Sequence, residues 1–365
     1  MEVINLNHDE RLLWLKFVLS PSSPCPKIDD WEALFNFADN QAIIGVCEPT
    51  RFNVFRPDID VFFEWIGVVE QLRGLNTHLN KQVVQLFLKL KEDGFRCCIL
   101  KGQGNAAMYP DPGLRTPGDI DVWVDADRET VLEYVKKVTP DVRENFKHIK
   151  LPLFENTEVD LHFTPLKLYH PIHNKRLQQW IQENKEEQMA HSFKLPSTDT
   201  DITIPTAEFN AVYQMGHIMV HVEDEGIGLR QMVDYFYVLR ALGGIVPEQK
   251  ETILRTWKML GMMKIAGAVM WVEHFVLGLP EEFLLTEPNE KRGRLLVADI
   301  FEGGNFGLYS RRQSLWSYGR FAKKSADAWH LIRISSLFPS EVFFRLVAKF
   351  MTACKDLFRY KRNTN

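Results

Sequence analysis

The chain has 365 residues, of which 45% are hydrophobic and 25% charged, and its formal net charge is −4. This composition is typical of a folded globular protein and excludes disordered and collagen-like chains, while the length allows two or three domain-sized units. Because 44 basic residues stand against 48 acidic ones, we expect no double-stranded DNA binding, which usually requires a basic surface. The balance still allows a local basic patch around a nucleotide.

The five cysteines are scattered and odd in number, without the spacing of a disulfide framework or of a zinc site. They predict reduced thiols and a cytoplasmic location. The apolar stretch near the N-terminus follows an acidic start and is interrupted by Lys16, so it is a poor signal peptide. No run of about 18 uncharged apolar residues occurs, and the sequence therefore predicts no membrane span.

The first 95 residues predict a helical region. Apolar residues recur at helical spacing over 12–18, 31–38 and 60–93. The breaker string SPSSPCP ends the first segment. Gly94 ends the last one, which is predicted as one long helix or two.

In residues 96–205 the helical periodicity gives way to short strand patterns, which predict an α/β core. RCCILKG is a short β-type run that ends at glycine, and GDIDVWV alternates polar and apolar side chains as a half-buried strand does. GNAAMY between them predicts a short helix, and Asp127 is expected to cap a helix through ETVLEYVKKV. KHIKLPLF and EVDLHFTP flank ENT and predict a β-hairpin. This order describes a small mixed sheet with helices covering one face.

After Thr206 the chain is predicted to be helical almost to its end, with Gly and Pro residues between the helices. The expected helices cover 207–222, 228–243, 248–278, 291–302, 313–333 and 341–361. The predicted fold class is α+β. A small mixed β-sheet core at 96–205 would be embedded between an N-terminal helical region at 1–95 and a C-terminal helical domain at 206–365.

Three aspartates carry the main chemical signal. Asp119 and Asp121 lie at positions i and i+2 of a predicted strand, so both side chains point to the same face. Asp160 lies in EVDLHF, where it shares a face with Glu158 and His162. Neighbouring strands would bring the three aspartates together, and like charges raise each other's pKa unless a cation neutralises them. Alternatively, the DID motif is a solvated strand edge and Asp160 is a surface residue.

A divalent cation that prefers carboxylate and phosphate oxygens suits such a cluster. We expect Mg²⁺ there, with Mn²⁺ as the alternative. Two ions about 4 Å apart could stabilise the attacking and leaving oxygens of a phosphoryl or nucleotidyl transfer.

The segment LKGQGNAAMYPDPGLRTPGDIDVWV, followed by EVDLHF, resembles the nucleotidyltransferase superfamily with the DNA polymerase β fold. Within it, the chain is most similar to a bacterial group known only as uncharacterised nucleotidyltransferases. The specific match covers about residues 97–165, with a looser similarity in WEALFNFADNQAIIGV and HIMVHVEDEGIGLRQMVD. The resemblance implies that Asp119 and Asp121 ligate the catalytic metals, that Asp160 completes the site, and that the turn at 101–104 holds the triphosphate.

Two features depart from the superfamily pattern. Gln103 follows the turn glycine Gly102 at the place where a serine commonly contacts a phosphate, and the interval from this turn to Asp119 is longer than usual. Lys101 and Arg115 are the candidate phosphate-binding cations, arginine as a planar bidentate partner and lysine as a point charge. Alternatively, Lys101 ends a strand and reaches solvent, and Arg115 pairs structurally with one of the two strand aspartates.

Other candidates lie on the predicted helices after residue 206. His217 and His221 are spaced i, i+4, but HIMVH lacks the glutamate of a metallopeptidase helix and no third ligand is obvious. We therefore expect His217 to line the substrate cleft rather than to bind zinc. Arg230 either forms an ion pair with Asp234 on the helix surface or faces the nucleotide or acceptor.

The C-terminal segment EVFFRLVAKFMTACKDLFRYKRN repeats apolar residues at helical spacing. Its basic residues are Arg345, Lys349, Lys355, Arg359, Lys361 and Arg362. Core packing with a solvated basic face is the expectation, and a helix that contacts a membrane surface or RNA is the alternative.

The predicted function is Mg-dependent transfer of a nucleoside monophosphate from a nucleoside triphosphate such as ATP, with release of pyrophosphate. The acceptor oxygen, on an unknown small molecule, protein or RNA end, would attack the α-phosphate in line. Its proton would go to Asp160 or be lost through a metal-lowered pKa, and His162 could assist the transfer, hold Asp160, or be structural. The alternatives are a catalytically silent nucleotide-binding or interaction protein on the same fold, and a toxin-like nucleotidyltransferase.

Overall fold

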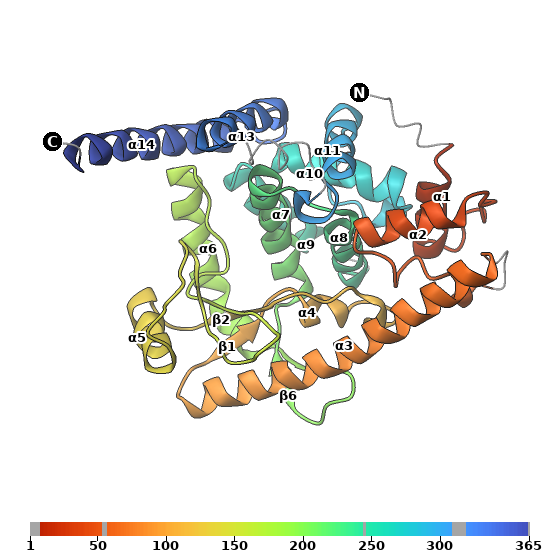
Figure 1. Ribbon diagram of the computed structural model, residues 1–365, viewed down its shortest axis with the longest axis horizontal. Coiled ribbons are helices and arrows are strands. Elements are labelled where there is room, and N and C mark those ends of the chain that lie inside the picture. The colour runs from red at the N-terminus through yellow and green to blue at the C-terminus, as the bar shows by residue number, and fades with distance from the viewer. Residues whose placement is uncertain (1–7, 53–56, 244–245, 309–318, 364–365) are drawn as a thin grey trace.

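The fold is taken from a computed structural model that describes residues 8–52, 57–243, 246–308 and 319–363, without the side chains of 320–321 and 352–363. In Figure 1 the sheet, α3 and α5 lie at the bottom, the helices from α7 to α11 lie above them, and α13 and α14 lie at the top. The helices before the sheet are α1 (Glu10–Leu19), α2 (Trp31–Asn40) and α3 (Ile59–Glu92). The segment predicted over 60–93 is thus a single helix, which runs beneath the sheet.

A four-stranded mixed sheet positions the candidate site. Its strands are β1 (Cys97–Ile99), β2 (Ile120–Val124), β3 (His148–Lys150) and β4 (Val159–His162), in the spatial order β1-β2-β4-β3. Strands β2 and β4 are parallel, whereas β1 and β3 pair antiparallel with their neighbours. The antiparallel pairing of β3 with β4 confirms the predicted hairpin. Together with the surrounding helices, this small mixed sheet confirms the predicted α+β fold class.

Helices pack against both faces of the sheet. Residues such as Ile120, Val122 and Leu161 join an apolar cluster with α3 and α5 (Arg128–Val138). The predicted cap of α5 is present, because the Asp127 carboxylate accepts a hydrogen bond from the Thr130 amide. On the other face, Trp123 stacks on Phe209 with ring centroids 6.0 Å apart. The sequence predicted helices on one face only; Trp123 gives the aspartate-bearing face an apolar end on which a second helix packs.

The helices after residue 206 form a second, larger cluster. They are α7 (Ala207–Asp224), α8 (Leu229–Ala241), α9 (Pro247–Met259), α10 (Met263–Trp271), α11 (Glu290–Gly303), α13 (Arg320–Ile334) and α14 (Pro339–Asn363). The segment predicted as one helix over 248–278 is divided at Gly261, which has a φ of +74° and lies so close to His173 that a Cβ would be 2.4 Å from the ring. The start of the helix predicted over 313–333 lies partly outside the described residues.

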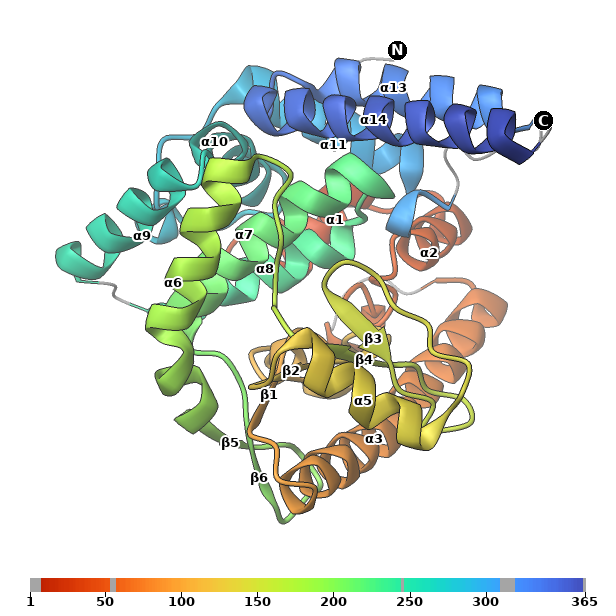
Figure 2. The same ribbon diagram turned by 90° about the vertical axis from the view of Figure 1, so that its left-hand side faces the viewer.

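No sequence pattern predicted α6 (Pro171–Ala190) or the hairpin of β5 (Ser192–Lys194) and β6 (Asp201–Thr203). Helix α6 has few buried side chains, so its apolar periodicity is weak. Its start did carry a signal: Pro171 is the first helical residue, and the His170 ring accepts a hydrogen bond from the His173 amide. Figure 2 shows α6 standing beside α7 and reaching from the sheet towards α14.

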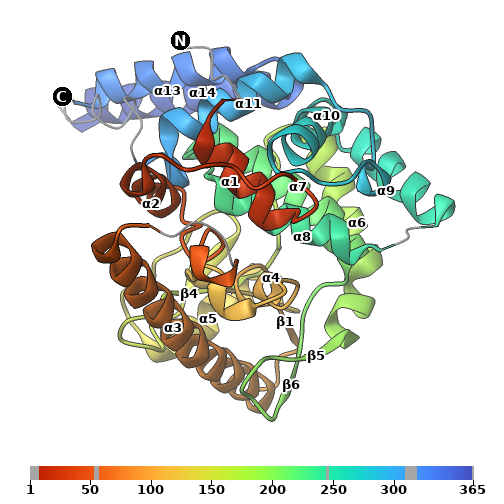
Figure 3. The same cartoon turned by 90° about the vertical axis from the view of Figure 1, so that its right-hand side faces the viewer.

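The larger apolar cluster contains residues from α1 to α14, so the N-terminal helices share a core with the C-terminal ones. Figure 3 shows α1 and α2 beside α8 and α11, above α3. The predicted boundaries between residues 95 and 96 and between 205 and 206 stay a prediction. None of the described helices combines the length and apolar character needed to cross a bilayer.

Helix α14 only partly follows the expected core packing. Val342 is buried, whereas Phe343, Phe350 and Met351 are exposed, Phe350 by 70%. Two of its basic residues are paired within the protein: Arg345 with Glu223 and Asp224, and Lys349 with Asp327. The other four basic residues of the predicted face, at 355, 359, 361 and 362, are among those whose side chains the structure does not describe.

The contact of Trp123 with α7 predicts a large effect on stability. Trp123 is 2% exposed, so Trp123→Ala should lower the free energy of unfolding by about 3–5 kcal/mol, the cost of removing a buried aromatic side chain. Chemical denaturation followed by circular dichroism measures the change. The matched control is Trp329→Ala, because Trp329 is 70% exposed; equal losses in the two variants would contradict the packing described here.

Candidate active site

Three aspartates meet on one face of the sheet, two of them on its central strands β2 and β4 and one immediately before β2. Asp121 and Asp160 are directly opposite one another in the parallel register of β2 and β4, and Asp119 immediately precedes β2. One carboxylate oxygen of each residue lies within 4.8 Å of the other two. Asp121 is 4% exposed and Asp160 5%, whereas Asp119 is exposed. The alternation of polar and apolar residues in GDIDVWV and EVDLHF therefore does place the three side chains in one patch.

Three basic side chains contact this patch. The Lys101 ammonium lies 2.8 Å from Oδ2 of Asp121, and Nε2 of His162 lies 2.7 Å from Oδ1 of the same residue. Nε2 of His148 lies 3.1 Å from Oδ2 of Asp160. Oδ1 of Asp160 is buried and has no hydrogen-bond partner among the described residues. Both oxygens of Asp121 are thus engaged, while one buried carboxylate oxygen remains open.

The three aspartates have different pKa shifts. The charge of Asp121 raises the pKa of Asp119. Burial, with the charges of Asp121 and Asp119, raises the pKa of Asp160 to about 7. Burial would also raise the pKa of Asp121. The Lys101 charge and the His162 hydrogen bond outweigh burial and hold the pKa of Asp121 well below its usual range. Without a further cation, Asp121 therefore stays ionised, and its negative charge raises the pKa values of Asp119 and Asp160.

The donor set fits a divalent cation. Carboxylate oxygens are the ligands that Mg²⁺ and Mn²⁺ prefer, and Oδ1 of Asp160, which no described residue contacts by a hydrogen bond, is available for coordination. A second possible donor group, His148, Asp160 and His162, overlaps the first at Asp160. Lys101 could remain beside Asp121 or turn to a phosphate, since it lines the cleft described below.

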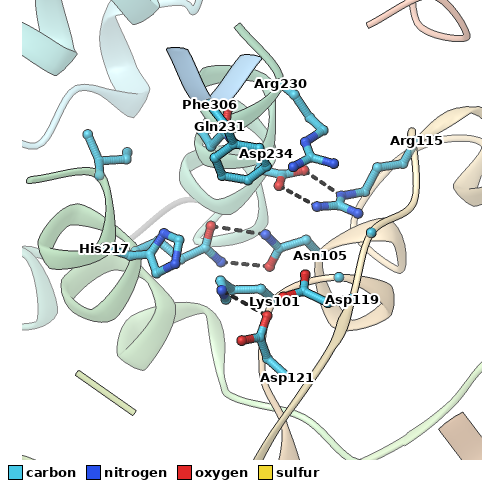
Figure 4. A pocket seen from close by; sticks show the side chains of 14 residues that line it. Lys101, Asn105, Arg115, Asp119, Asp121, His217, Arg230, Gln231, Asp234 and Phe306 are labelled. Atoms are coloured by element: carbon cyan, nitrogen blue, oxygen red, sulfur yellow. Dashed lines mark hydrogen bonds and ion pairs between the residues drawn. The ribbon is translucent and has the colours of Figure 1, made fainter. Parts of the chain in front are cut away.

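The aspartate patch opens into a cleft of about 810 Å³. The residues that line it include Lys101, Asp119, Asp121, Lys147, His148, Asp160, His221, Arg230 and Phe306. A narrower pocket continues from it between β2, α7 and α8 and shares Lys101, Asp119 and Asp121 with it. Figure 4 shows this pocket, with Asp121 on one side and Arg230 and Phe306 on the other. A cleft of this size is large enough for a nucleotide.

The glycine turn after β1 brings its backbone, but not Gln103, to the pocket. Gly102 has a φ of +50°, which favours glycine, and it lines the pocket. The buried Gln103 amide instead donates to Asn80 on α3. Asn105 lines the pocket and exchanges two hydrogen bonds with Gln214 of α7, which Figure 4 draws as dashed lines. The phosphate contact predicted for Gln103 stays a prediction, but in this structure its side chain points away from the pocket.

Arg115 lines the pocket, with its guanidinium bound to a partner from α8. Its Nε and Nη2 each lie 2.8 Å from one carboxylate oxygen of Asp234, and the Tyr109 hydroxyl donates to the same carboxylate at 2.6 Å. The alternative of an ion pair with Asp119 or Asp121 is therefore not observed. Burial alone would lower the pKa of Arg115, but the charge of Asp234 outweighs this effect and raises it. A phosphate role for Arg115 stays a prediction.

Arg230 faces the cleft instead of pairing with Asp234 four residues later. It is 7% exposed, and its Nη1 lies 3.3 Å and 3.5 Å from the carbonyl oxygens of Thr116 and Pro117. Its Nε is buried without a hydrogen-bond partner among the described residues. Asp234 is occupied by Arg115, which explains why the helix-surface pair does not form.

His217 lines the narrower pocket, and its Nε2 lies 3.0 Å from Nε2 of His221; its place in a substrate cleft stays a prediction. Burial, with the charges of Lys101 and of the neighbouring histidine, lowers the pKa of His217 well below its usual range. Neither histidine belongs to a group that could hold a metal ion among the described residues.

Several cleft residues escaped the sequence analysis. His148 pairs with His162 across β3 and β4, and the predicted hairpin register could have revealed it. Lys147 lies next to it, and burial and the Lys101 charge lower its pKa to about 8. Asn105 and Phe306 come from a four-residue helix and a distant turn, and no local pattern marks either as a cleft residue.

Comparison with known proteins identifies the family. Residues 28–278 match the model of a family described as uncharacterised nucleotidyltransferases, and the chain belongs to this family. A solved structure, the antigenic nucleotidyltransferase-like protein from Paracoccidioides brasiliensis, is similar at a TM-score of 0.30 and 13% identity, over 52% of this chain and 88% of that one. This likeness is too low to support an argument. No curated protein sequence is significantly similar to the chain.

The raised pKa of Asp160 predicts how stability depends on pH in the metal-free protein. Because the folded state binds this proton more tightly than the unfolded state, the stabilisation is present below about pH 4 and is lost as the pH rises through 7. Asp160→Asn removes this titration. Its free energy of unfolding relative to the wild type should therefore increase between pH 5 and 7.5, by roughly 1–3 kcal/mol.

Denaturation in the presence of EDTA at several pH values measures this difference. Parallel pH profiles for the two proteins would show that Asp160 titrates normally. Adding Mg²⁺ at pH 7.5 should stabilise the wild type more than Asp160→Asn, because a bound cation removes the repulsion between the aspartates.

Proposed function

We propose that the protein is a Mg-dependent nucleotidyltransferase, with Mn²⁺ as an alternative metal. It transfers a nucleoside monophosphate from a nucleoside triphosphate to an acceptor hydroxyl or phosphate and releases pyrophosphate. The observation that carries the proposal is the meeting of the Asp119, Asp121 and Asp160 carboxylates within 4.8 Å of each other at one end of a nucleotide-sized cleft. Membership of the nucleotidyltransferase family supports the choice of substrate.

The charges in the cleft suit a triphosphate. The aspartates occupy one side, where a cation would be held, and Arg230 lies on the other side without a carboxylate ion pair among the described residues. Lys101 lies between the two, next to the glycine turn. An anionic ligand would give Arg230 the negatively charged partner that it lacks among the described residues, since buried cations are stable only when paired.

In this proposal each residue has a definite task. Asp119, Asp121 and Asp160 would hold the metal, which supplies charge neutralisation at the transferring phosphate. Arg230 and Lys101 would orient the triphosphate so that the acceptor oxygen meets the α-phosphorus opposite the bond to pyrophosphate. The acceptor's proton would go to Asp160, or it would be lost because the metal lowers the pKa of the acceptor oxygen. His162 would fix Asp121 through its 2.7 Å contact, which makes it a positioning residue.

Replacing the strand aspartates tests the catalytic assignment. The double variant Asp119→Asn, Asp121→Asn should lose transfer by about a thousandfold or more, because both metal ligands are removed while side-chain shape is kept. The assay incubates the protein with each α-labelled triphosphate, Mg²⁺ and a cell extract and follows the label into a product.

Asp125→Asn is the matched control, because Asp125 follows β2 but pairs with Arg96 and Lys185 outside the cleft. Full activity in the double variant would refute the assignment. Absence of label transfer by the wild type with every nucleotide would favour a silent nucleotide-binding protein. Growth arrest on expression that Asp119→Asn relieves would favour the toxin-like alternative.

Replacing Arg230 tests the triphosphate side of the cleft. Arg230→Gln should weaken triphosphate binding roughly tenfold to a hundredfold, the range expected for the loss of a charge-assisted hydrogen bond. Isothermal titration calorimetry measures the change. The control is Arg240→Gln on the same helix, because Arg240 is exposed; unchanged affinity in Arg230→Gln would assign this arginine a structural role only.

A further inference from the structure

Phe306 has an unusual position for an aromatic residue. It lies in η5 (Asn305–Gly307), far in sequence from the strands, yet it lines both the cleft and the narrower pocket. It belongs to neither apolar cluster of the described residues. Figure 4 shows it beside Arg230, across the pocket from Asp121. Its ring therefore contributes to the wall of the cleft, not to the core.

The backbone of Phe306 is in the left-handed region, with φ 54° and ψ 29°. For a bulky residue this conformation is rare, costs on the order of 1 kcal/mol or more, and persists only where the surroundings enforce it. Gly304 and Gly307 on either side also have positive φ angles, of 61° and 66°. The chain thus makes a tight turn whose one large side chain is directed into the cleft.

Close backbone packing holds this turn in place. It lies against the connection between α7 and α8, where a Cβ on Gly228 would come within 2.8 Å of Cα of Asn305. The Gln231 amide, at the start of α8, also donates to the Asn305 side chain at 3.4 Å. Position 228 therefore requires glycine, because any side chain there would clash with the turn at Asn305. This close packing fixes where the Phe306 ring can lie.

The ring has polar neighbours. The Arg230 guanidinium carbon lies 5.1 Å from its centroid, within the range of a cation–π contact, and the His221 ring centroid lies 5.6 Å away. Phe306 is half-buried, so part of the ring is open to a ligand. The Phe306 ring offers a flat apolar surface that suits a base, and Arg230 next to it offers a cation that suits a phosphate. Together they match the two chemical parts of a nucleotide.

We propose that Phe306 is the surface on which the base of the nucleoside triphosphate stacks. The inference rests on the proposed function and adds the mode of nucleotide recognition. Stacking uses the π-face that all bases share, so it predicts weak discrimination among the four nucleotides. The turn lies beyond residues 28–278, the part of the chain that matches the family model, so this recognition element would come from the C-terminal region of the chain.

The test compares a ligand that has a base with one that has none. Affinities are measured by calorimetry with Mg²⁺ for the α,β-methylene analogues of ATP, GTP, CTP and UTP and for inorganic tripolyphosphate. Phe306→Ala should weaken binding of all four nucleotides by roughly five- to a hundred-fold, the effect of removing a base-stacking aromatic ring. Binding of tripolyphosphate should stay within about twofold of the wild type, and Phe306→Trp should restore nucleotide binding.

Phe63→Ala is the control for a lost aromatic ring, because Phe63 is exposed on α3 outside the cleft. Thermal denaturation of each variant verifies that it is folded. Unchanged nucleotide affinity in Phe306→Ala, or equal losses for nucleotides and tripolyphosphate, would overturn the inference while leaving the proposed function intact. If the wild type bound neither ligand, the proposed function would fail together with it.

Discussion

The parallel pairing of β2 with β4 places two carboxylates side by side in a nearly buried position, and the chemistry of the cleft follows from that contact. Asp121 faces Asp160 because their strands are in register, not because either attracts the other. The repulsion is partly offset by Lys101 and His162, which both contact Asp121. The offset is incomplete, since the pKa of Asp160 stays raised and its Oδ1 has no hydrogen-bond partner in the part of the chain that the structure describes. Such a patch gains stability when it binds a cation.

The helical part of the chain supplies what the sheet lacks. Arg230 on α8 brings a cation to the side of the cleft opposite the aspartates, and the turn that carries Phe306 packs on the connection between α7 and α8. Sheet and helices therefore contribute complementary groups: oxygen ligands from the strands, and a cation with an aromatic ring from the helices. The cleft is wide enough to bring both sets to one nucleotide.

Much of this arrangement could be read from local pattern. Alternation in GDIDVWV and EVDLHF predicted two strands and the shared face of their aspartates, because the side-chain period of a strand is fixed by its geometry. Partners that depend on tertiary contact could not be found in the same way. Arg115 binds Asp234, which lies 119 residues later, and the spacing of Arg230 and Asp234 suggested a different pair. Helix α6 was missed because it buries few apolar residues, and Phe306 because its placement depends on backbone packing between distant turns.

The buried ion pair of Arg115 and Asp234 has a consequence for how the protein can be divided. It joins the loop that leads into β2 to a helix more than a hundred residues away, and the Tyr109 hydroxyl completes the contact. A fragment that ended after the strands would keep all three aspartates, but it would leave a buried guanidinium without its counterion, a costly state. Asp234 of α8 therefore stabilises the loop that leads to Asp119, a contact that a fragment limited to the strands would lack.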